Sequence, residues 1–168
     1  MKKSSMDKKQ FAKRLQNQKA KYYRIAYSYV KNEHDALDII GEATYKGLKG
    51  LHTLQKPEYF DTWMTRIVIN TAIDYMRKNA RIVCYEDKIM DVMIVTESEL
   101  AIEDSMDLFD ALDALSERDR ACVLLRYFEE YTFIKIAEVM QEPEPTVKSR
   151  IYRALGKMYN FIEEGRRK

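Results

Sequence analysis

The sequence predicts an all-α protein in which two small helical domains are joined by an acidic linker. Glycine and proline are scarce, with five and three among 168 residues, so few residues interrupt a helix. Apolar residues recur at helical spacing along most of the chain. That spacing is lost in residues 82–104, which carry many acidic side chains. We therefore expect a first domain at 1–81, a linker at 82–104 and a second domain at 105–168.

The charges are segregated along the chain, although the net charge is only +2. Residues 1–81 hold 17 Lys/Arg against 8 Asp/Glu, residues 82–119 hold 2 against 12, and residues 120–168 hold 10 against 7. Two basic blocks separated by an acidic one predict two surfaces that bind polyanions. Ordinary solvated helix faces are the alternative, and so large a swing makes that alternative the weaker one.

The first domain is expected to contain a series of amphipathic helices. An apolar stripe between residues 11 and 30 predicts one long helix or two shorter ones, and residues 31–33 suit a turn. A second helix is expected at 33–51, a loop at Pro57, and a third helix from Tyr59 or Asp61 to Lys78. The second helix offers Ala36, Leu37, Ile40, Ala43, Tyr45 and Leu48 to the core, and the third offers Trp63, Met64, Ile67, Val68, Thr71, Ala72 and Tyr75.

The second domain is expected to start with a helix at about Ser105. Ser116 is placed to cap the next helix, which runs to about Glu129. That helix offers Val123, Leu124, Tyr127 and Phe128 to the core.

Residues 131–158 predict a helix-turn-helix. A first helix fits Thr132 to Met140, residues 141–145 break it, and a second helix begins at about Pro145, because proline suits a first turn. The second helix turns Val147, Ile151, Ala154, Leu155 and Met158 inward and leaves cations and a hydroxyl on its other faces near its start. A short helix, a tight turn and such a second helix fit the major groove of DNA. The alternative is a helical hairpin with a solvated basic face.

Several classes of protein and site are not expected. The chain has no apolar run long enough to insert into a membrane, and residues 1–14 are basic without the apolar core of a signal peptide. Cys84 and Cys122 lie far apart, which suits reduced thiols in a cytoplasmic protein. His34 and His52 are isolated, so no metal site is expected. Without a phosphate-binding glycine loop or a nucleophile–base pair, we expect no enzyme and no cofactor.

Three segments in series resemble the extracytoplasmic-function (group IV) sigma factors of bacterial RNA polymerase. FDTWMTRIVINTAIDYMRKNAR, residues 60–81, resembles the promoter-melting segment. YRIAYSYVKNEHDALDIIGEATYKGL, residues 23–48, resembles the segment that binds core polymerase. Residues 113–140 together with TVKSRIYRAL, residues 146–155, resemble the C-terminal promoter-binding domain. The resemblance spans about Lys21 to Tyr159, in the order that the family has.

The resemblance implies that the third helix reads the −10 promoter element as its bases leave the stack. Arg66, Asn70 and Asp74 are four residues apart and share one helical face. Their side chains can hold phosphate, read a base edge and accept from an exposed amino group. Arg77 and Lys78 suit phosphate contacts farther along, and a salt bridge from Asp74 to either of them is an equally good interpretation of that carboxylate.

Two aromatic residues at the start of this helix are candidates for touching bases. Tyr59 and Phe60 lie where the loop enters the helix, and the family has a base-capturing loop in this neighbourhood. Trp63 is in phase with Met64 and Ile67, so we expect it in the core.

The resemblance further implies that the helix from Thr146 to Leu155 reads the duplex −35 element. The contact positions of the family correspond to Lys148, Ser149, Arg150 and Tyr152. Arg153 suits a phosphate, and Thr146 suits a cap or a phosphate contact.

The chain departs from the family pattern at a few positions of this turn and elsewhere. Pro145 replaces a common glycine, Glu142 and Glu144 would repel DNA if they pointed toward it, Lys135 replaces a glutamate, and Gly41 replaces a glutamine.

The partners implied by the resemblance are core RNA polymerase, promoter DNA and an anti-sigma factor. Asp38, Ile39 and Glu42 match the polymerase-binding helix, where an acidic and apolar face suits a basic partner. Simple solvent exposure of the two carboxylates is the alternative. The family role is that of a bacterial alternative sigma factor that directs promoter-specific initiation.

Two other functions compete with this interpretation. A free-standing helix-turn-helix regulator would bind duplex DNA without polymerase. A helical interaction protein, such as a degenerate sigma-like decoy, would bind polymerase without starting transcription.

Overall fold

The computed structural model describes residues 6–80 and 102–168, with side chains from residue 107 onward in the second range. Every regular element in these ranges is a helix, so the predicted all-α class is confirmed. The chain divides into two compact units, Met1–Val92 and Met93–Lys168. Residues 82–101 of the expected linker lie outside the described ranges, and residues 102–104 already belong to a helix.

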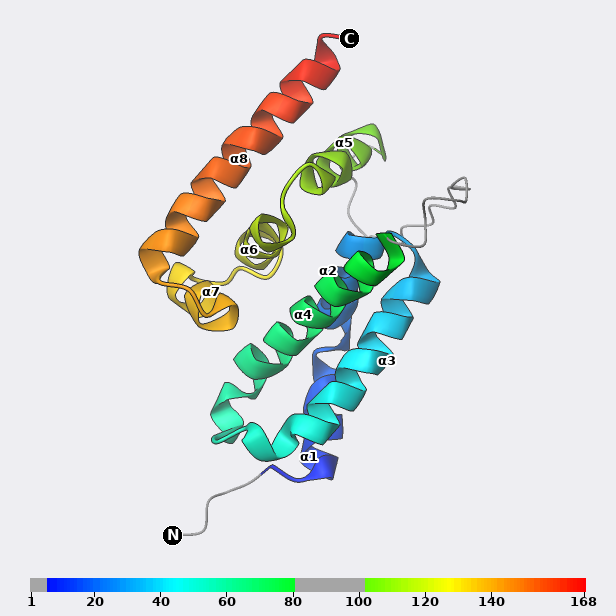
Figure 1. The fold of residues 1–168 in the computed structure, drawn as a ribbon, viewed down its shortest axis with the longest axis vertical. Coiled ribbons are helices and arrows are strands. Elements are labelled where there is room, and N and C mark those ends of the chain that lie inside the picture. Colours follow the sequence, from blue (N-terminus) through cyan, green and yellow to red (C-terminus); the bar gives the residue numbers. More distant parts are fainter. Residues whose placement is uncertain (1–5, 81–101) are drawn as a thin grey trace. The chain divides into compact units, whose positions relative to one another are not determined.

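The first unit is built on a three-helix bundle. Its elements are α1 (Lys8–Asn17), α2 (Lys19–Val30), α3 (Glu33–Gly50), the short 3-10 helices η1 (Leu51–Thr53) and η2 (Pro57–Tyr59), and α4 (Phe60–Ala80). Helices α2, α3 and α4 pack against one another, and α1 packs on α2 (Figure 1). The apolar stripe at 11–30 therefore forms two helices. The largest side chains of the core include Tyr22, Ile25, Ile39, Met64 and Ile69.

Local capping explains where these helices begin and end. The Asp7 carboxylate accepts a 2.7 Å hydrogen bond from the Gln10 amide, and the Gln10 side chain returns to Asp7 to complete a capping box. Asn32 caps α3 by accepting from the Asp35 amide at 2.8 Å. Lys31 ends α2 in the left-handed conformation, with φ 57°, which produces the expected turn.

Gly47 permits close packing at the centre of the first unit. A Cβ atom at this position would lie 3.0 Å from both the Met64 sulfur and the Phe11 ring. The glycine weakens α3 in isolation, yet it lets α3 approach its neighbours where a side chain would force them apart.

The second unit contains the helix-turn-helix. Its elements are α5 (Ile102–Asp113), α6 (Glu117–Tyr127), α7 (Phe133–Met140) and α8 (Glu144–Arg166). The long helix α8 packs against α5, α6 and α7 (Figure 1). The core of this unit includes Leu112, Leu125, Ile136, Val147 and Ile151.

Capping in the second unit follows the sequence at one helix and departs from it at another. Ser116 caps α6 as expected by accepting from the Asp119 amide at 3.2 Å. Thr146 does not cap α8, because that helix begins at Glu144 and its N-cap residue is Pro143. Tyr127 and Phe128, expected in the core, are exposed at the end of α6.

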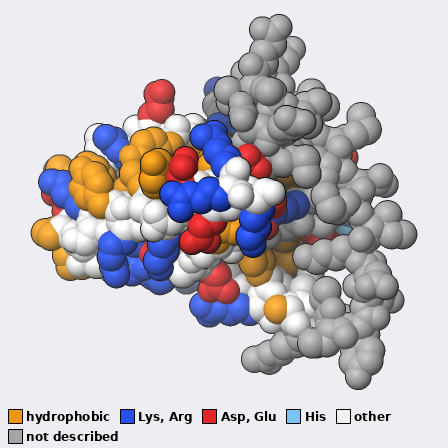
Figure 2. All heavy atoms as spheres, turned by 90° about the horizontal axis from the view of Figure 1, so that it is seen from above, with side chains coloured by type: hydrophobic (Ala, Val, Ile, Leu, Met, Phe, Trp, Pro, Cys, Tyr) orange, Lys and Arg blue, Asp and Glu red, His pale blue; other side chains and the backbone are white. Residues whose placement is uncertain are grey.

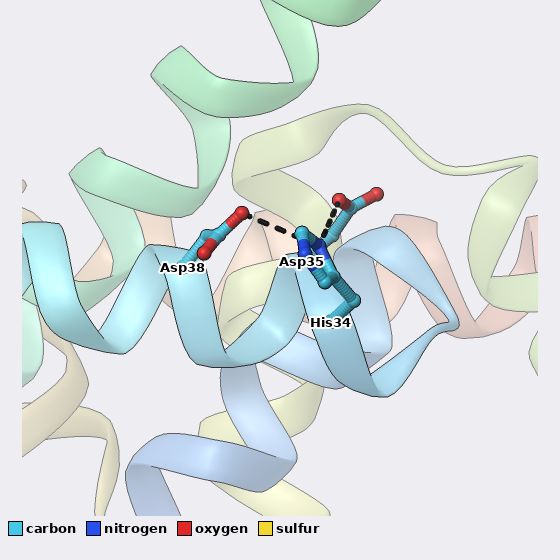
Figure 3. A group of neighbouring side chains, drawn as sticks. All are labelled: His34, Asp35 and Asp38. Carbon is cyan, nitrogen blue, oxygen red and sulfur yellow. Dashed lines mark ion pairs between the residues drawn. The ribbon is translucent and has the colours of Figure 1, made fainter.

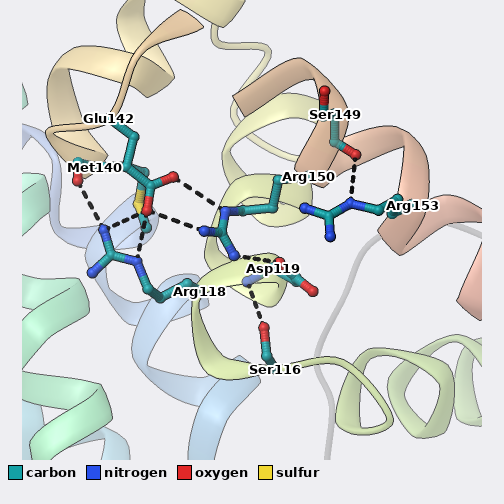
Figure 4. Close-up of polar contacts among 8 residues, drawn as sticks. All are labelled: Ser116, Arg118, Asp119, Met140, Glu142, Ser149, Arg150 and Arg153. Carbon is teal, nitrogen blue, oxygen red and sulfur yellow. Dashed lines mark hydrogen bonds and ion pairs between the residues drawn. The ribbon is translucent and has the colours of Figure 1, made fainter. Parts of the chain in front are cut away.

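A network of four charged side chains holds the turn between α7 and α8. Arg150 donates to Asp119 Oδ1 at 2.7 Å and to Glu142 Oε2 at 3.1 Å. Arg118 donates to Glu142 Oε1 at 2.9 Å and to the Met140 carbonyl at 2.9 Å. Both guanidinium groups thus converge on the Glu142 carboxylate (Figure 4). Since these residues come from α6, the turn and α8, the network fixes all three relative to one another.

The thiol of Cys122 lies in the core of the second unit, close to this network. Burial raises the pKa of the Cys122 thiol to about 12, while the nearby Arg150 opposes that shift and Glu142 adds to it. Thiolate is the reactive form of cysteine, so the native fold protects Cys122 in two ways: it excludes reagent and it suppresses ionisation.

We predict that Cys122 is labelled by a thiol reagent only when the second unit opens. In a Cys84→Ser variant at about pH 8, native labelling should be at least about a hundredfold slower than labelling in urea, because little thiolate forms. Absorbance of the released thiol-reagent product measures both rates. Native labelling as fast as that of the unfolded chain would contradict the buried position.

Candidate nucleic-acid and polymerase interfaces

Helix α4 presents a polar face that runs along its C-terminal half. Asn70, Asp74, Arg77 and Lys78 are exposed, and Arg66 is half-buried at the start of this face. Burial lowers the pKa of Arg66. A salt bridge from Asp74 to Arg77 or Lys78 stays the alternative interpretation of the Asp74 carboxylate, since all three side chains are exposed on this face.

Of the two aromatic candidates at the start of α4, only Tyr59 is accessible. Tyr59 is exposed on η2, where the Lys56 ammonium lies 5.9 Å from its ring centroid. Phe60 is buried and packs edge-on against Phe11, with the ring centroids 5.6 Å apart. The prediction that Phe60 touches bases is therefore corrected: its ring anchors the loop from inside. Trp63 is half-buried beside it.

The first turns of α8 carry the predicted duplex-reading side chains. Val147 and Ile151 are buried against the unit, whereas Thr146, Lys148, Ser149, Tyr152 and Arg153 are exposed. Tyr152 is 62% exposed, and its ring lies 6.3 Å from that of Phe133 on α7.

Two cations of this helix have contacts that leave them at the surface. The Lys148 ammonium lies 3.4 Å from Glu144 and 5.4 Å from the Phe133 ring centroid. Arg153 donates to the carbonyl of Ser149 at 3.3 Å. Both side chains are exposed.

Arg150 differs from its neighbours, and its predicted role is corrected. Its side chain is 20% exposed and is engaged by Asp119 and Glu142, so it does not offer a guanidinium to a base. Its partners raise its pKa against the opposing effect of burial. The sequence left open whether Glu142 would point toward DNA and repel it. Its carboxylate instead points toward the guanidinium groups of Arg118 and Arg150.

Helix α3 exposes carboxylates together with apolar side chains. The side chains of Asp38 and Glu42 are 53% and 39% exposed, and Glu42 pairs with Lys46 at 3.0 Å. Ile39 is fully buried, so its predicted contact with polymerase is corrected. Leu37, Tyr45 and Leu48, which were expected in the core, are instead 46%, 64% and 40% exposed. Leu37, the exposed Gly41, Tyr45 and Leu48 follow one another at spacings of four, four and three residues, and this helical spacing is the signal that marks a second apolar stripe.

His34 is not isolated, because it lies against two carboxylates of the same helix end. Its Nδ1 atom is 3.6 Å from Asp35 and 3.4 Å from Asp38 (Figure 3). Ligand-type atoms of the three residues lie within 4.8 Å of one another. Burial favours a raised pKa for Asp35, but hydrogen bonds from Asn32 and Tyr75, together with His34, keep it below its ordinary value.

The surface seen in Figure 2 combines cations with apolar groups. Lysine and arginine side chains lie beside exposed hydrophobic ones over the described part of that face. Among the described helices, none is both long and apolar enough to cross a membrane.

Comparison with known proteins identifies the family. The family profile of Sigma-70 region 2 matches residues 15–82, and that of Sigma-70 region 4 matches residues 105–158. RNA polymerase sigma factor SigV of Bacillus subtilis is 39% identical over 155 residues, which cover 89% of this chain and 92% of SigV. The ECF RNA polymerase sigma factor SigW of the same organism is 27% identical over 160 residues, covering 88% and 86%.

Solved structures share the fold at low sequence identity. The structure of the sigma factor RpoE in complex with the anti-sigma factor NepR, from Bartonella quintana, matches with a TM-score of 0.75 at 19% identity, covering 92% of this chain and 98% of the matched chain. CnrH in complex with the cytosolic domain of CnrY matches with a TM-score of 0.71 at 18% identity, covering 95% and 92%. With the family matches and the two helical units, these findings place the chain in the extracytoplasmic-function group of RNA polymerase sigma factors, which bind core polymerase and direct initiation at promoters.

Proposed function

We propose that the two domains divide promoter recognition between them. Residues 1–81 bind core polymerase and open the −10 element, residues 105–168 bind the duplex −35 element, and residues 82–104 connect them. The observation that carries this proposal is the two-sided character of α8. In its first turns this helix buries Val147 and Ile151 and exposes polar and cationic side chains on the opposite side.

At the −35 element, α8 enters the major groove with its first turns. Lys148 bridges guanine acceptors or a phosphate, Ser149 contacts a base edge or a phosphate, and Tyr152 supplies an apolar ring with a hydroxyl. Thr146 and Arg153 hold phosphates on either side. Arg150 does not contact DNA; its ion pair with Asp119 fixes α8 on α6.

At the −10 element, α4 holds the strand that leaves the duplex. Asn70 reads a base through its amide and Arg66 holds a base edge or a phosphate, while Asp74 accepts from an amino group. Arg77 and Lys78 follow the backbone, and Tyr59 is the aromatic side chain positioned to stack.

Core polymerase binds the exposed side of α3. Asp38 and Glu42 attract a basic partner, and Leu37, Tyr45 and Leu48 form the apolar anchor in place of the buried Ile39. These three side chains are exposed at helical spacing, and burial of such groups is the main favourable term in association.

Control by an anti-sigma factor in the cytoplasm is part of the proposal. RpoE was solved with the anti-sigma factor NepR, and CnrH with the cytosolic domain of CnrY. Exposed apolar side chains on α3 and at the end of α6 offer surfaces that such a partner would cover.

The direct test combines the purified full chain with bacterial core polymerase and a library of forked promoter DNA. We expect core-dependent enrichment of a two-part motif, together with transcripts from the enriched sequences. Retention of duplex DNA without polymerase would favour the free-standing regulator. Binding to polymerase without transcripts would favour the decoy.

Single substitutions should separate the two elements. Asn70→Ala should weaken opening of the −10 element about tenfold, and Lys148→Ala should weaken −35 binding by a similar factor, because each removes one contact. Lys157→Ala, exposed farther along α8, is the matched control. Binding of holoenzyme to DNA in which only one element is intact measures each effect. Equal losses on both elements would contradict the division of labour.

A further inference from the structure

The loop that carries Tyr59 has little regular structure of its own. Between α3 and α4 the chain forms the three-residue 3-10 helices η1 and η2, and the Tyr59 amide donates to the Lys56 carbonyl at 3.1 Å. Short 3-10 helices have poorer hydrogen-bond geometry than α-helices. Contacts from outside the loop must therefore contribute to its position.

The two N-terminal helices supply polar contacts on both sides of Tyr59. Arg14 of α1 donates from Nη1 to the carbonyl of Pro57 in η2. Lys21 of α2 is buried and forms an ion pair with Asp61 in the first turn of α4. Pro57 and Asp61 stand two residues before and two residues after Tyr59. The segment that carries the tyrosine is therefore held at both of its ends.

The ring of Phe60, next to Tyr59 in the chain, is held by the same helix α1. It packs edge-on against Phe11, and the Arg14 guanidinium lies 5.9 Å from its centroid. Arg14 thus contacts both the backbone of η2 and the first residue of α4. Tyr59 itself is exposed, although the residues around it are held.

Helix α1 lies largely outside the range that the family profile matches. The profile of region 2 begins at residue 15, whereas Phe11 and Arg14 precede it. The start of α1 is itself well defined, because Asp7 and Gln10 form a capping box and Met6 is buried. The chain thus adds to the matched region a fixed helix that supports the loop.

We infer that α1 is a positioning element for Tyr59 and that Arg14 is the residue through which it acts. A base stacks with less loss of entropy on a ring whose position is already restricted. By holding the Pro57 carbonyl, Arg14 restricts the loop in the free protein. Arg14 is thus a positioning residue, whereas Tyr59 makes the contact with DNA. This inference rests on the proposed role of Tyr59 at the −10 element.

The first test needs no DNA and uses the free full-length chain. Arg14→Met keeps the apolar stem and removes the donor, so hydrogen exchange of the Tyr59 amide, measured by NMR, should become about fivefold faster. Arg14→Lys can still donate to the Pro57 carbonyl and should leave the rate within about twofold. Lys13→Met, which removes an exposed lysine of the same helix, is the matched control for the loss of one charge.

The second test assembles the full-length chain with core polymerase and a forked promoter DNA that carries a single-stranded −10 segment. Arg14→Met should weaken fork binding about fivefold, because Tyr59 must then be ordered when the base binds. In a Tyr59→Ala background, the same substitution should change fork binding by less than about twofold, because no ring is left to position. Lys13→Met should leave fork binding within about twofold of the wild type.

Several results would overturn the inference. Unchanged exchange of the Tyr59 amide in Arg14→Met would show that Arg14 does not hold the loop. An equal loss of fork binding with and without the Tyr59 ring would mean that Arg14 acts on DNA itself, and an equal loss in Lys13→Met would mean that only charge matters. Weaker binding of Arg14→Met to core polymerase alone, or of its holoenzyme to the −35 duplex, would show an effect not confined to the loop.

Failure of the proposed sigma function gives a different result. In that case the wild-type chain forms no core-dependent complex with the fork, before any variant is compared. The exchange measurement on the free chain still decides whether Arg14 holds the loop.

Discussion

The ion network around Glu142 is the constraint on which the proposed recognition of the −35 element depends. The turn between α7 and α8 carries Glu142, and α8 begins with Glu144, whose carboxylate lies 3.4 Å from the Lys148 ammonium. Left unpaired, the Glu142 carboxylate would repel phosphates, and α8 would have no ionic contact with α6. Arg118 and Arg150 resolve both difficulties, because they neutralise Glu142 and join it to Asp119 on α6. Such partly buried charges are costly alone but tolerable when each has an opposite partner and hydrogen bonds.

This arrangement divides the beginning of α8 into three sides with different tasks. Val147 and Ile151 fill the core, Arg150 ties the helix to α6 and the turn, and Lys148, Ser149 and Tyr152, the proposed DNA contacts, are exposed. In the first unit, too, some side chains fill the core while others remain exposed, and glycine and aromatic packing have the positioning role that ion pairs have in the second unit. Gly47 brings α3 close to its neighbours, Phe60 anchors the loop from inside, and the outer sides of α3 and α4 carry the exposed side chains that we propose as contacts for partners.

The positions of the helices could be predicted from the local sequence. The burial and the partners of several side chains could not. Helical periodicity and caps such as Ser116 depend on residues a few positions apart, so the sequence carries them directly. The role of Arg150 depends on Asp119, a residue of another helix, and no periodic pattern reveals that pairing. Ile39 and Phe60 are both fully buried, and their burial depends on other helices: the Phe60 ring, for example, packs against Phe11 of α1, a contact that no local pattern reveals. Leu37 and Tyr45 were expected in the core but are exposed. An apolar residue at helical spacing can belong to a second apolar stripe that faces outward.

A double-mutant cycle between Arg150 and Glu142 tests most directly whether this network holds α8 in place. Arg150→Met, Glu142→Gln and the double variant are compared in a Cys84→Ser background, with urea unfolding followed by labelling of Cys122, which reports on the second unit alone. We expect a coupling free energy of about 2 kcal/mol, because both partners are mostly buried and doubly hydrogen-bonded. A coupling within about 0.5 kcal/mol of zero would mean that the network does not fix the helix, and Arg150 would then return to the set of candidate DNA contacts.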